Sequence, residues 1–317
     1  MGEPTRIVML GTGDFALPTF ELLAERGHEM AALVTQPDRP QGRRQEITPA
    51  AIAVAARARG VRVFQPENVN DPASLAVLRS FAPDLLITAA YGQILSAEAL
   101  AIGRMGGVNL HGSILPAYRG AAPVARAIQN GEVVTGVTVI QMTPRIDAGG
   151  IVGIGRLNID PDETAGELEA RLARLGAPLL ADCIPRILAG TATIIPQDIA
   201  QVTRAPKLKK EESAIKWTRP ALDVHNMVRA MQPWPVASTM LLREGVGPSR
   251  LIVHKTAVTE GSGEPGAVVE AENGRLTVAC GDGAVTLLLV QTPGGRPLTA
   301  AEFLNGRKIA RGDTLKS

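Results

Sequence analysis

Three polar residues near the middle of the chain combine types and spacing that suit acyl-group chemistry. Asn109 and His111 lie two positions apart at the end of a run with strand composition. In an extended run both side chains leave the same face, at the carboxyl end of a strand, where open α/β sheets bind ligands. Asp147 follows a second expected strand, residues 136–142, in a glycine-containing loop that allows a return to the same rim. The three residues are therefore candidates for one shared site.

The chemistry of such a site follows from the three groups. An amide donor and a protonated imidazole can hold a developing oxyanion, and a carboxylate can orient the imidazole and relay a proton. Each residue also has a purely structural interpretation, because a lone Asn or His at a strand end is often only hydrogen-bonded, and Asp near glycine is common in turns. Spacing alone leaves both interpretations open.

A glycine-rich turn near the amino terminus resembles a dinucleotide fingerprint. The segment Gly11-Thr-Gly-Asp-Phe-Ala16 follows a buried strand run and precedes a helix. That fingerprint needs an acidic residue at the end of the second strand to hold the ribose hydroxyls, and Thr35-Gln36 stands there instead. We therefore predict a tight strand-to-helix turn and no NAD. A nicotinamide-dependent oxidoreductase remains the alternative from another class.

Strands and helices alternate through the first half of the chain, which predicts a Rossmann-like, doubly wound α/β domain with a mostly parallel sheet. After residue 160, Thr164 and Glu167 form a capping-box signature that opens a helix toward Leu175. Gly176 predicts a break before a second helix, from about Pro178 to Ala189. The expected strands are 6–10, 30–34, 61–64, 84–88 and 108–111, and the expected helices are 17–26, 49–59 and 71–80.

The composition changes at Gly190, where a polar, extended stretch leads into a lysine run. Beyond it lie a helix, about 221–231, and then five short strands, which predict a small OB-like β-barrel. The strands expected there are 238–242, 250–259, 266–270, 275–279 and 284–291, followed by a last helix capped at Thr299. We predict a catalytic domain at 1–189, an interdomain linker at 190–210 and a C-terminal domain at 211–317.

Charge is small overall but unevenly placed. The net charge of the 317 residues is +2, yet residues 1–205 contain no lysine and the lysines begin at Lys207. An excess of positive charge in the second half points to an anionic partner. Cys183 and Cys280 are isolated, the four histidines lack ligand spacing, and no apolar run reaches the length of a membrane span. We expect a cytoplasmic protein with no metal and no membrane partner.

Two basic segments are candidates for phosphate contacts. The Pro- and Gly-punctuated loop 35–45 carries Arg39, Arg43 and Arg44, and guanidinium groups match phosphate oxygens in geometry. Such a loop is equally consistent with a solvated connection. Lys207, Lys209 and Lys210 lie at the end of the expected linker.

Several motifs together carry a resemblance to a known family. Over essentially its whole length the sequence resembles the methionyl-tRNA formyltransferases, which are 10-formyltetrahydrofolate-dependent formyltransferases. The segment 109–116 with an Asp further on is shared across those formyltransferases, and the continuation at 118–123 is typical of the tRNA enzymes. The motifs are Gly11-Thr-Gly-Asp-Phe-Ala16, Thr35-Gln-Pro-Asp-Arg-Pro-Gln-Gly-Arg43, Ala90-Tyr-Gly92, Asn109-Leu-His-Gly-Ser-Ile-Leu-Pro116, Tyr118-Arg-Gly-Ala-Ala-Pro123, Gly136-Val-Thr-Val-Ile-Gln-Met142 and Pro233-Trp-Pro235.

The resemblance implies an enzyme of translation initiation that moves the formyl group of 10-formyltetrahydrofolate to the α-amino group of methionyl initiator tRNA. It implies no metal and no side-chain nucleophile, because the amine attacks directly, and we expect a monomer. The implied residues are Asn109, His111 and Asp147 for catalysis, Ser113, Ile114, Leu115, Pro116, Ala89, Tyr91 and Gly92 for folate, and Arg39, Arg43, Arg44, Lys207, Lys209 and Lys210 for tRNA.

Two departures from the family pattern are visible. The loop after Arg43 continues as Arg44-Gln45-Glu46, without the lysines often found there, and Gly13 replaces a usual proline. A formyltransferase acting on a small amine, such as a nucleotide sugar or glycinamide ribotide, is the closest alternative. A tRNA-binding protein without catalysis is a third possibility, although the intact trio argues against it.

Overall fold

The computed structural model of the chain describes residues 5–41, 46–243, 245–306 and 309–317. Contacts between residues divide it into two compact units, and the chain passes between them several times. The first unit contains Met1–Pro123, Val134–Leu157 and Glu169–Pro206, and the second contains Val124–Val133, Asn158–Leu168 and Lys207–Ser317. The interdomain linker at 190–210 stays a prediction. By their contacts, residues 190–206 group with the first unit.

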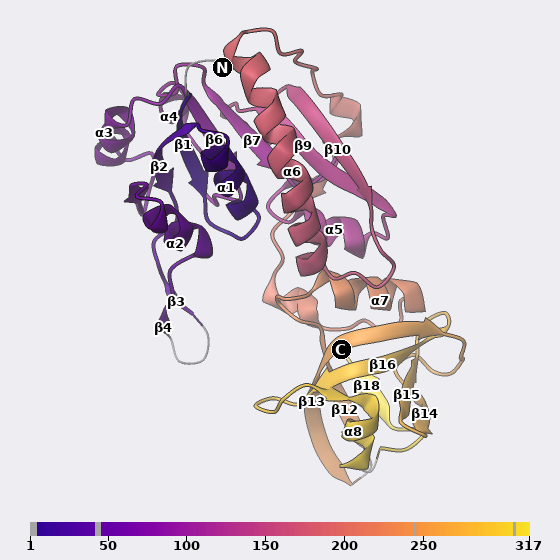
Figure 1. The fold of residues 1–317 in the computed structure, drawn as a ribbon. Coiled ribbons are helices and arrows are strands. Elements are labelled where there is room, and N and C mark those ends of the chain that lie inside the picture. The colour runs from indigo at the N-terminus through magenta and orange to yellow at the C-terminus, as the bar shows by residue number, and fades with distance from the viewer. Residues whose placement is uncertain (1–4, 42–45, 244, 307–308) are drawn as a thin grey trace. The chain divides into compact units, whose positions relative to one another are not determined.

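The first unit is built on a seven-stranded sheet with the order β10-β9-β7-β6-β1-β2-β5 (Figure 1). Its strands are β1 (Arg6–Gly11), β2 (Glu29–Val34), β5 (Val63–Phe64), β6 (Leu85–Ala89), β7 (Gly107–His111), β9 (Val134–Gln141) and β10 (Ile151–Asn158). From β5 to β7 all neighbours are parallel, whereas β9 runs antiparallel to β7. The chain builds outward from β1 in both directions, so β1 and β6 flank the point where the strand order reverses. The predicted doubly wound, mostly parallel sheet is confirmed.

Helices cover both faces of this sheet because its central strands are buried on both sides. One face packs against α3 (Pro72–Ser80) and α4 (Ala97–Leu100) through a single hydrophobic cluster. On the other face lie α1 (Leu17–Glu25), α2 (Ala51–Ala58) and the long α6 (Ala165–Leu188) (Figure 1). Short elements complete the unit: β3 (Pro40–Gln41), β4 (Glu46–Ile47), β8 (Arg119–Gly120), β11 (Arg204–Ala205) and a 3-10 turn at Ile199–Gln201.

The prediction of a helix break at Gly176 is wrong, because α6 is continuous from Ala165 to Leu188. A Cβ added at Gly176 would lie 2.6 Å from Leu110 Cδ2, so this glycine lets the helix approach β7 closely. Strand β10 was not predicted. Its glycines weaken the strand pattern, yet Gly155 lies under Leu175 of α6, where an added Cβ would come within 3.2 Å.

The second unit contains an antiparallel barrel. Its strands follow the order β14-β15-β16-β13-β12-β18, and the ring closes through an antiparallel bridge between Ala267 and Thr314. The elements are α5 (Pro123–Gln129), a 3-10 turn at Lys210–Ser213, α7 (Ala221–Ala230), β12 (Ser238–Arg243), β13 (Val246–Thr259), β14 (Val268–Glu272), β15 (Arg275–Ala279), β16 (Ala284–Gln291), β17 (Leu298–Thr299), α8 (Ala300–Asn305) and β18 (Thr314–Lys316). The predicted OB-like barrel is confirmed.

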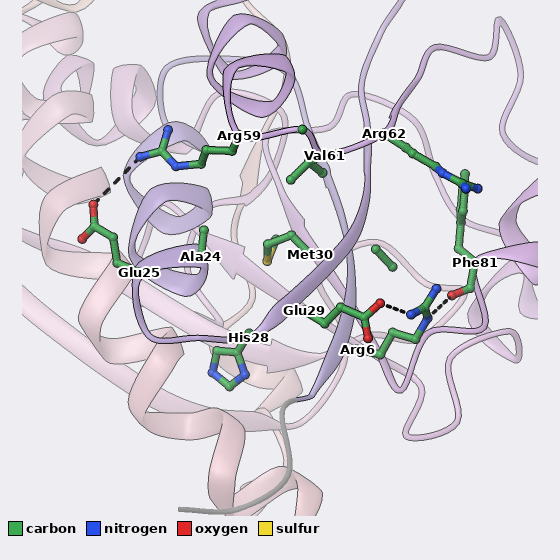
Figure 2. Close-up of a pocket in the computed structure, with 12 residues that line it drawn as sticks. Arg6, Ala24, Glu25, His28, Glu29, Met30, Arg59, Val61, Arg62 and Phe81 are labelled. Carbon is green, nitrogen blue, oxygen red and sulfur yellow. Dashed lines mark hydrogen bonds and ion pairs between the residues drawn. The ribbon is translucent and has the colours of Figure 1, made fainter.

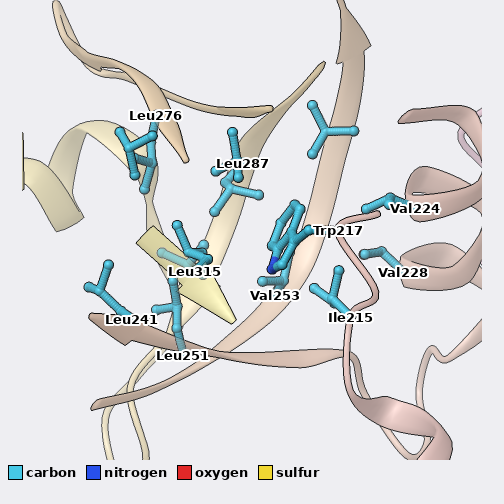
Figure 3. Close-up of a cluster of buried hydrophobic side chains, with 14 of the residues drawn as sticks. Ile215, Trp217, Val224, Val228, Leu241, Leu251, Val253, Leu276, Leu287 and Leu315 are labelled. Atoms are coloured by element: carbon cyan, nitrogen blue, oxygen red, sulfur yellow. The ribbon is translucent and has the colours of Figure 1, made fainter. Parts of the chain in front are cut away.

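A hydrophobic core fills the barrel (Figure 3). Trp217 is 3% exposed and lies at its centre, with Val224 and Val228 of α7 on one side and Leu315 of β18 on another. The indole N–H donates to Thr239 Oγ1 at 3.0 Å, so the buried polar atom is satisfied. Among the described residues, no helix combines the length and apolarity that a membrane crossing requires.

Candidate active site at the carboxyl edge of the sheet

Asn109 and His111 leave β7 on the face opposite α6. Leu110 between them contacts Gly176 of α6, and successive residues of a strand point to opposite faces. The close packing of α6 therefore fixes the orientation of β7 from behind. As predicted from the spacing of two, both polar side chains share one face at the strand's carboxyl end.

A buried hydroxyl on the neighbouring strand orients the Asn109 amide. Thr88 of β6 is 4% exposed and donates from Oγ1 to Asn109 Oδ1 at 2.7 Å. Because Oδ1 is engaged, the donor nitrogen Nδ2 faces the other way, toward Asp147 Oδ1 at 3.5 Å. That distance is too long for a strong hydrogen bond, so the amide donor keeps its capacity for a substrate oxygen.

The imidazole of His111 is held at one nitrogen and directed at Asp147 with the other. Nε2 lies 2.9 Å from the Tyr118 carbonyl oxygen, which can only accept, so Nε2 donates and carries a proton. Nδ1 lies 3.6 Å from Asp147 Oδ2, and the two side chains are 6% and 13% exposed. The nitrogen available to a substrate is therefore Nδ1.

Asp147 reaches the two strand residues from a loop that curls back. Because β9 is antiparallel to β7, its last residue, Gln141, lies opposite Val108 near the amino end of β7. The following loop must therefore turn back to bring Asp147 to Asn109 and His111. Asp147 has a φ of 49°, a left-handed conformation that non-glycine residues adopt only when their surroundings hold them. Its Oδ2 accepts the Gly120 N–H at 2.9 Å. The three predicted side chains are thus brought together through the expected return of this loop, although the antiparallel direction of β9 was not expected.

The segment predicted to bind folate is a tightly hydrogen-bonded turn after β7. Ser113 is fully buried and its hydroxyl donates to the Ala117 carbonyl at 2.7 Å, so this side chain serves the turn. Thr138 of β9 ties the turn down, donating to the Ser113 carbonyl and accepting from the Leu115 N–H. Ile114 and Pro116 are partly exposed and leave an apolar surface there.

The other predicted folate residues follow β6, the parallel neighbour of β7. Ala89 is buried, Gly92 is exposed with a φ of 85°, and the ring of Tyr91 belongs to the hydrophobic cluster beneath α3 and α4. Burial raises the pKa of the Tyr91 phenol, whose oxygen has no hydrogen-bond partner in the described structure. The ends of β6 and β7 thus present mainly main-chain groups and small or apolar side chains.

The predicted basic contacts lie on both units. Arg39 is exposed and pairs with Glu67 at 3.1 Å, an interaction worth less than about 1 kcal/mol in solvent. Arg43 and Arg44 lie outside the described residues. Lys207, Lys209 and Lys210 are exposed on the second unit, next to Glu212, which forms a bidentate ion pair with Arg126 at 2.7 and 3.0 Å. Arg126 lowers the pKa of the Glu212 carboxyl.

The glycine turn at the end of β1 is a packing device. A Cβ at Gly11 would lie 2.6 Å from Ala16 Cβ and 3.0 Å from the Ala89 carbonyl oxygen, so only glycine fits. Gln36, where a dinucleotide site needs an acid, donates its side-chain amide to the Tyr91 carbonyl. Within the described part of the chain, no group of three or more His, Cys, Asp or Glu side chains has the arrangement of a metal site.

A cavity of about 640 Å³ lies elsewhere, at the amino edge of the same sheet (Figure 2). Met30 and Val61 line it, together with the ion pairs Arg6–Glu29 and Arg59–Glu25. None of the predicted site residues lines it. Because two of its arginines are already paired with glutamates, we place the functional site at the carboxyl edge.

The chain matches two family models, one described as formyl transferase over residues 5–184 and one as formyl transferase, C-terminal domain, over residues 207–308. It is 43% identical over 312 residues to the methionyl-tRNA formyltransferase of Moorella thermoacetica, covering 98% of this chain and 99% of that protein. The chain belongs to the methionyl-tRNA formyltransferase family. A second relative with the same name, from Acetivibrio thermocellus, is 41% identical over 313 residues, with the same coverage.

Solved structures with the same fold are more distant in sequence. HypX from Aquifex aeolicus in complex with tetrahydrofolic acid matches with a TM-score of 0.64 at 17% identity, over 98% of this chain and 50% of that one. An N-formyltransferase from Helicobacter canadensis, in complex with folinic acid and dTDP-3-aminofucose, gives 0.65 at 16% identity, over 89% and 98%. These likenesses support the fold. Family membership, which makes the chain a formyltransferase, comes from the full-length relatives.

Proposed function

We propose that this protein transfers the formyl group of 10-formyltetrahydrofolate to the α-amino group of methionyl initiator tRNA, giving N-formylmethionyl-tRNA for translation initiation. The observation that carries the proposal is the convergence of Asn109, His111 and Asp147 at the carboxyl edge of the sheet. It occurs in a chain that aligns over nearly its whole length with methionyl-tRNA formyltransferases.

Two donors are placed to hold the oxyanion that forms when the amine attacks the formyl carbon. Asn109 Nδ2 is turned away from Thr88 toward Asp147, and His111 Nδ1, which is a donor when the imidazole is protonated, also faces Asp147. The long contacts of both atoms to Asp147, 3.5 and 3.6 Å, leave room for a reacting oxygen to accept from them. Preorganised donors of this kind lower the barrier without reorganising during the reaction.

Asp147 is the proton carrier in this proposal. After the nitrogen–carbon bond forms, the attacking nitrogen is positively charged and must lose a proton. Asp147 accepts that proton and delivers it to the folate nitrogen as the bond between that nitrogen and the formyl carbon breaks and the carbonyl re-forms. The Gly120 N–H at 2.9 Å from Oδ2 holds the carboxylate in place through both transfers.

10-Formyltetrahydrofolate supplies the formyl group, and the ends of β6 and β7 fit its flat ring. Residues 89–92 and 113–116 lie at these strand ends, and the partly exposed Ile114 and Pro116 offer apolar contacts. Because β6 and β7 are adjacent and parallel, a ligand held there has its reactive end beside Asn109. We assign these segments to folate binding.

We assign the exposed basic residues Arg39, Lys207, Lys209 and Lys210 to the tRNA, together with Arg43 and Arg44. Such contacts depend on phosphate charge and weaken with salt. The division into a catalytic domain at 1–189, a linker at 190–210 and a tRNA-binding domain at 211–317 is part of the same proposal. We expect the protein to act as a monomer in the cytoplasm.

The test is a label-transfer assay with 10-formyltetrahydrofolate labelled in the formyl carbon. Charged initiator tRNA, charged elongator tRNA and a small free amine are offered in parallel. The proposal predicts label on initiator methionyl-tRNA alone. Label on the small amine alone would show that tRNA is not the acceptor, while leaving the proposed catalytic roles of Asn109, His111 and Asp147 unchanged.

A further inference from the structure

Gln197, in the segment that follows α6, joins the two loops that carry the candidate site. Its side-chain nitrogen Nε2 donates to the carbonyl oxygens of Asp147 at 2.8 Å and Gly149 at 2.7 Å. Both hydrogens of the amide are therefore used on the loop that presents the Asp147 carboxylate. Nothing in the sequence pattern marked this glutamine.

The oxygen of the same amide is equally engaged. Gln197 Oε1 accepts from Arg119 Nε at 3.0 Å and Arg119 Nη2 at 2.7 Å. A guanidinium can only donate and a main-chain carbonyl can only accept, so the orientation of the amide is fixed by its partners. A carboxylate at this position would keep the arginine and lose both bonds to the loop.

Arg119 belongs to the turn that holds the other side of the site. Its own N–H donates to the Thr203 carbonyl at 2.9 Å, and the Tyr118 N–H donates to Thr203 Oγ1 at 2.8 Å. The Tyr118 carbonyl holds His111, and the next residue, Gly120, holds Asp147. One segment, residues 197–205, thus anchors both the imidazole and the carboxylate.

The backbone at these anchors is in an unfavourable conformation. Asp147 and Tyr118 have φ values of 49° and 62°, and non-glycine residues keep such conformations only where the surrounding contacts hold them. Asp147 Oδ2 makes one short hydrogen bond, to Gly120, within the site. The two hydrogen bonds from Gln197 to the main chain of the Asp147 loop therefore help to fix the position of the Asp147 carboxylate.

We propose that Gln197 is a positioning residue for formyl transfer, which holds the Asp147 loop at reacting distance by bridging it to Arg119. The proposal rests on the proposed function for its kinetic readout. It assigns a role in the chemical step to the stretch 190–206, which the sequence presents only as a polar connection.

The experiment compares Gln197→Ala and Gln197→Glu with the wild-type enzyme in steady-state formyl transfer. We expect kcat to fall about tenfold to a hundredfold in both, the range found for residues that orient the ligands of a catalytic metal, with little change in KM for either substrate. The Glu variant is decisive because it retains size and the Arg119 contact but sets an oxygen against two carbonyl oxygens. Activity near wild type in Gln197→Glu would overturn the proposal.

Gln201→Ala is the matched control. Gln201 is an exposed glutamine of the same segment, and its side chain donates to Asp198. We expect this variant to keep wild-type kcat and KM. A loss equal to that of Gln197→Ala would mean that the segment, and not the bridging amide, matters, and would also overturn the proposal.

Amide hydrogen exchange over residues 143–150 gives a readout independent of turnover. We expect faster exchange in Gln197→Ala than in wild type, with the barrel peptides unchanged. If the wild-type enzyme formylates no acceptor, the proposed function fails, and this exchange measurement still decides whether Gln197 holds the loop. Unchanged exchange would contradict the inference whatever the substrate is.

Discussion

The two edges of the same sheet differ in how their carboxylates are satisfied. At the amino edge, Asp84 accepts the Arg6 N–H through Oδ2 and Arg104 Nε through Oδ1, both at 2.9 Å. At the carboxyl edge, Asp147 makes one short bond, to the Gly120 N–H, and faces Asn109 and His111 at 3.5 and 3.6 Å. Short hydrogen bonds from a main-chain N–H and a guanidinium stabilise the fold, whereas polar groups that face each other without a short hydrogen bond keep capacity for a substrate.

The charged groups at the amino edge are mostly paired with neighbouring groups. The backbone hydrogen bond from Arg6, followed by the hydrogen bond from Arg104, lowers the pKa of Asp84. Glu29 pairs with Arg6, and Arg6 Nε donates to the Phe81 carbonyl at 2.6 Å. The charges around the cavity of Figure 2 are thus largely matched by their neighbours, which makes this edge a stabilising surface and the opposite edge the reactive one.

The largest effect is expected from His111→Ala at the carboxyl edge. Loss of one preorganised donor should lower kcat about a hundredfold or more, with tRNA binding nearly intact. His28→Ala, which removes the histidine lining the amino-edge cavity, is the control and should turn over like the wild type. Equal losses of binding and turnover in His111→Ala would mean that the imidazole is structural.

A smaller effect is expected from Gly176→Ala, which acts on the packing behind the site. The new Cβ would lie 2.6 Å from Cδ2 and 3.2 Å from Cγ of the buried Leu110. Overpacking costs about 1–3 kcal/mol, which exceeds the gain of about 1 kcal/mol in helix propensity, so thermal unfolding should begin at a lower temperature. Gly13→Ala, whose Cβ meets nothing within 4 Å, should unfold near the wild-type temperature. A more stable Gly176→Ala would disprove the close approach of α6 to β7.

The smallest effect is expected from Asp84→Asn. Asp84 and Arg104 are partly exposed, so removing this charge should cost less than about 1 kcal/mol of stability at neutral pH. Because folding lowers the pKa of Asp84, its contribution is present above the unfolded-state pKa and disappears as pH falls through the folded-state pKa. Urea unfolding of both proteins at neutral and acidic pH should therefore show a difference that narrows on acidification. A constant difference would mean that the charge of Asp84 is not the cause.

The sequence was sufficient for the parts of the fold that rest on local patterning. Buried runs such as 6–10 and 84–88 gave strands in place, because apolar periodicity and turn residues are local signals. The sequence did not predict elements in which a glycine allows close packing against a distant segment. Gly176 and Gly155 resemble breaks in a helix and a strand, yet both lie where α6 packs against the sheet. The antiparallel direction of β9 was also beyond it, because strand direction depends on pairing across the chain.

The candidate site divides in the same way. Asn109 and His111 could be paired from their spacing of two in a strand, and Asp147 was a candidate because it follows a strand in a glycine-containing loop; the family resemblance then assigned the three to catalysis. The groups that orient them could not be found, because Thr88, Tyr118 and Gln197 act through contacts separated by 21, 7 and 50 residues. No periodicity gives these contacts, and the motif that contains Tyr118 does not show that its carbonyl holds His111, so only the folded chain reveals them.

One measurement tests the contrast between the two edges most directly: the single-turnover rate of formyl transfer to methionyl initiator tRNA for Asp147→Asn and for Asp84→Asn. Each change replaces a carboxylate by an amide of the same shape, at opposite edges of one sheet. The account predicts that Asp147→Asn is slower by about a hundredfold or more, because the amide cannot carry the proton, and that Asp84→Asn matches the wild type. A wild-type rate in Asp147→Asn, or equal losses in both, would contradict it.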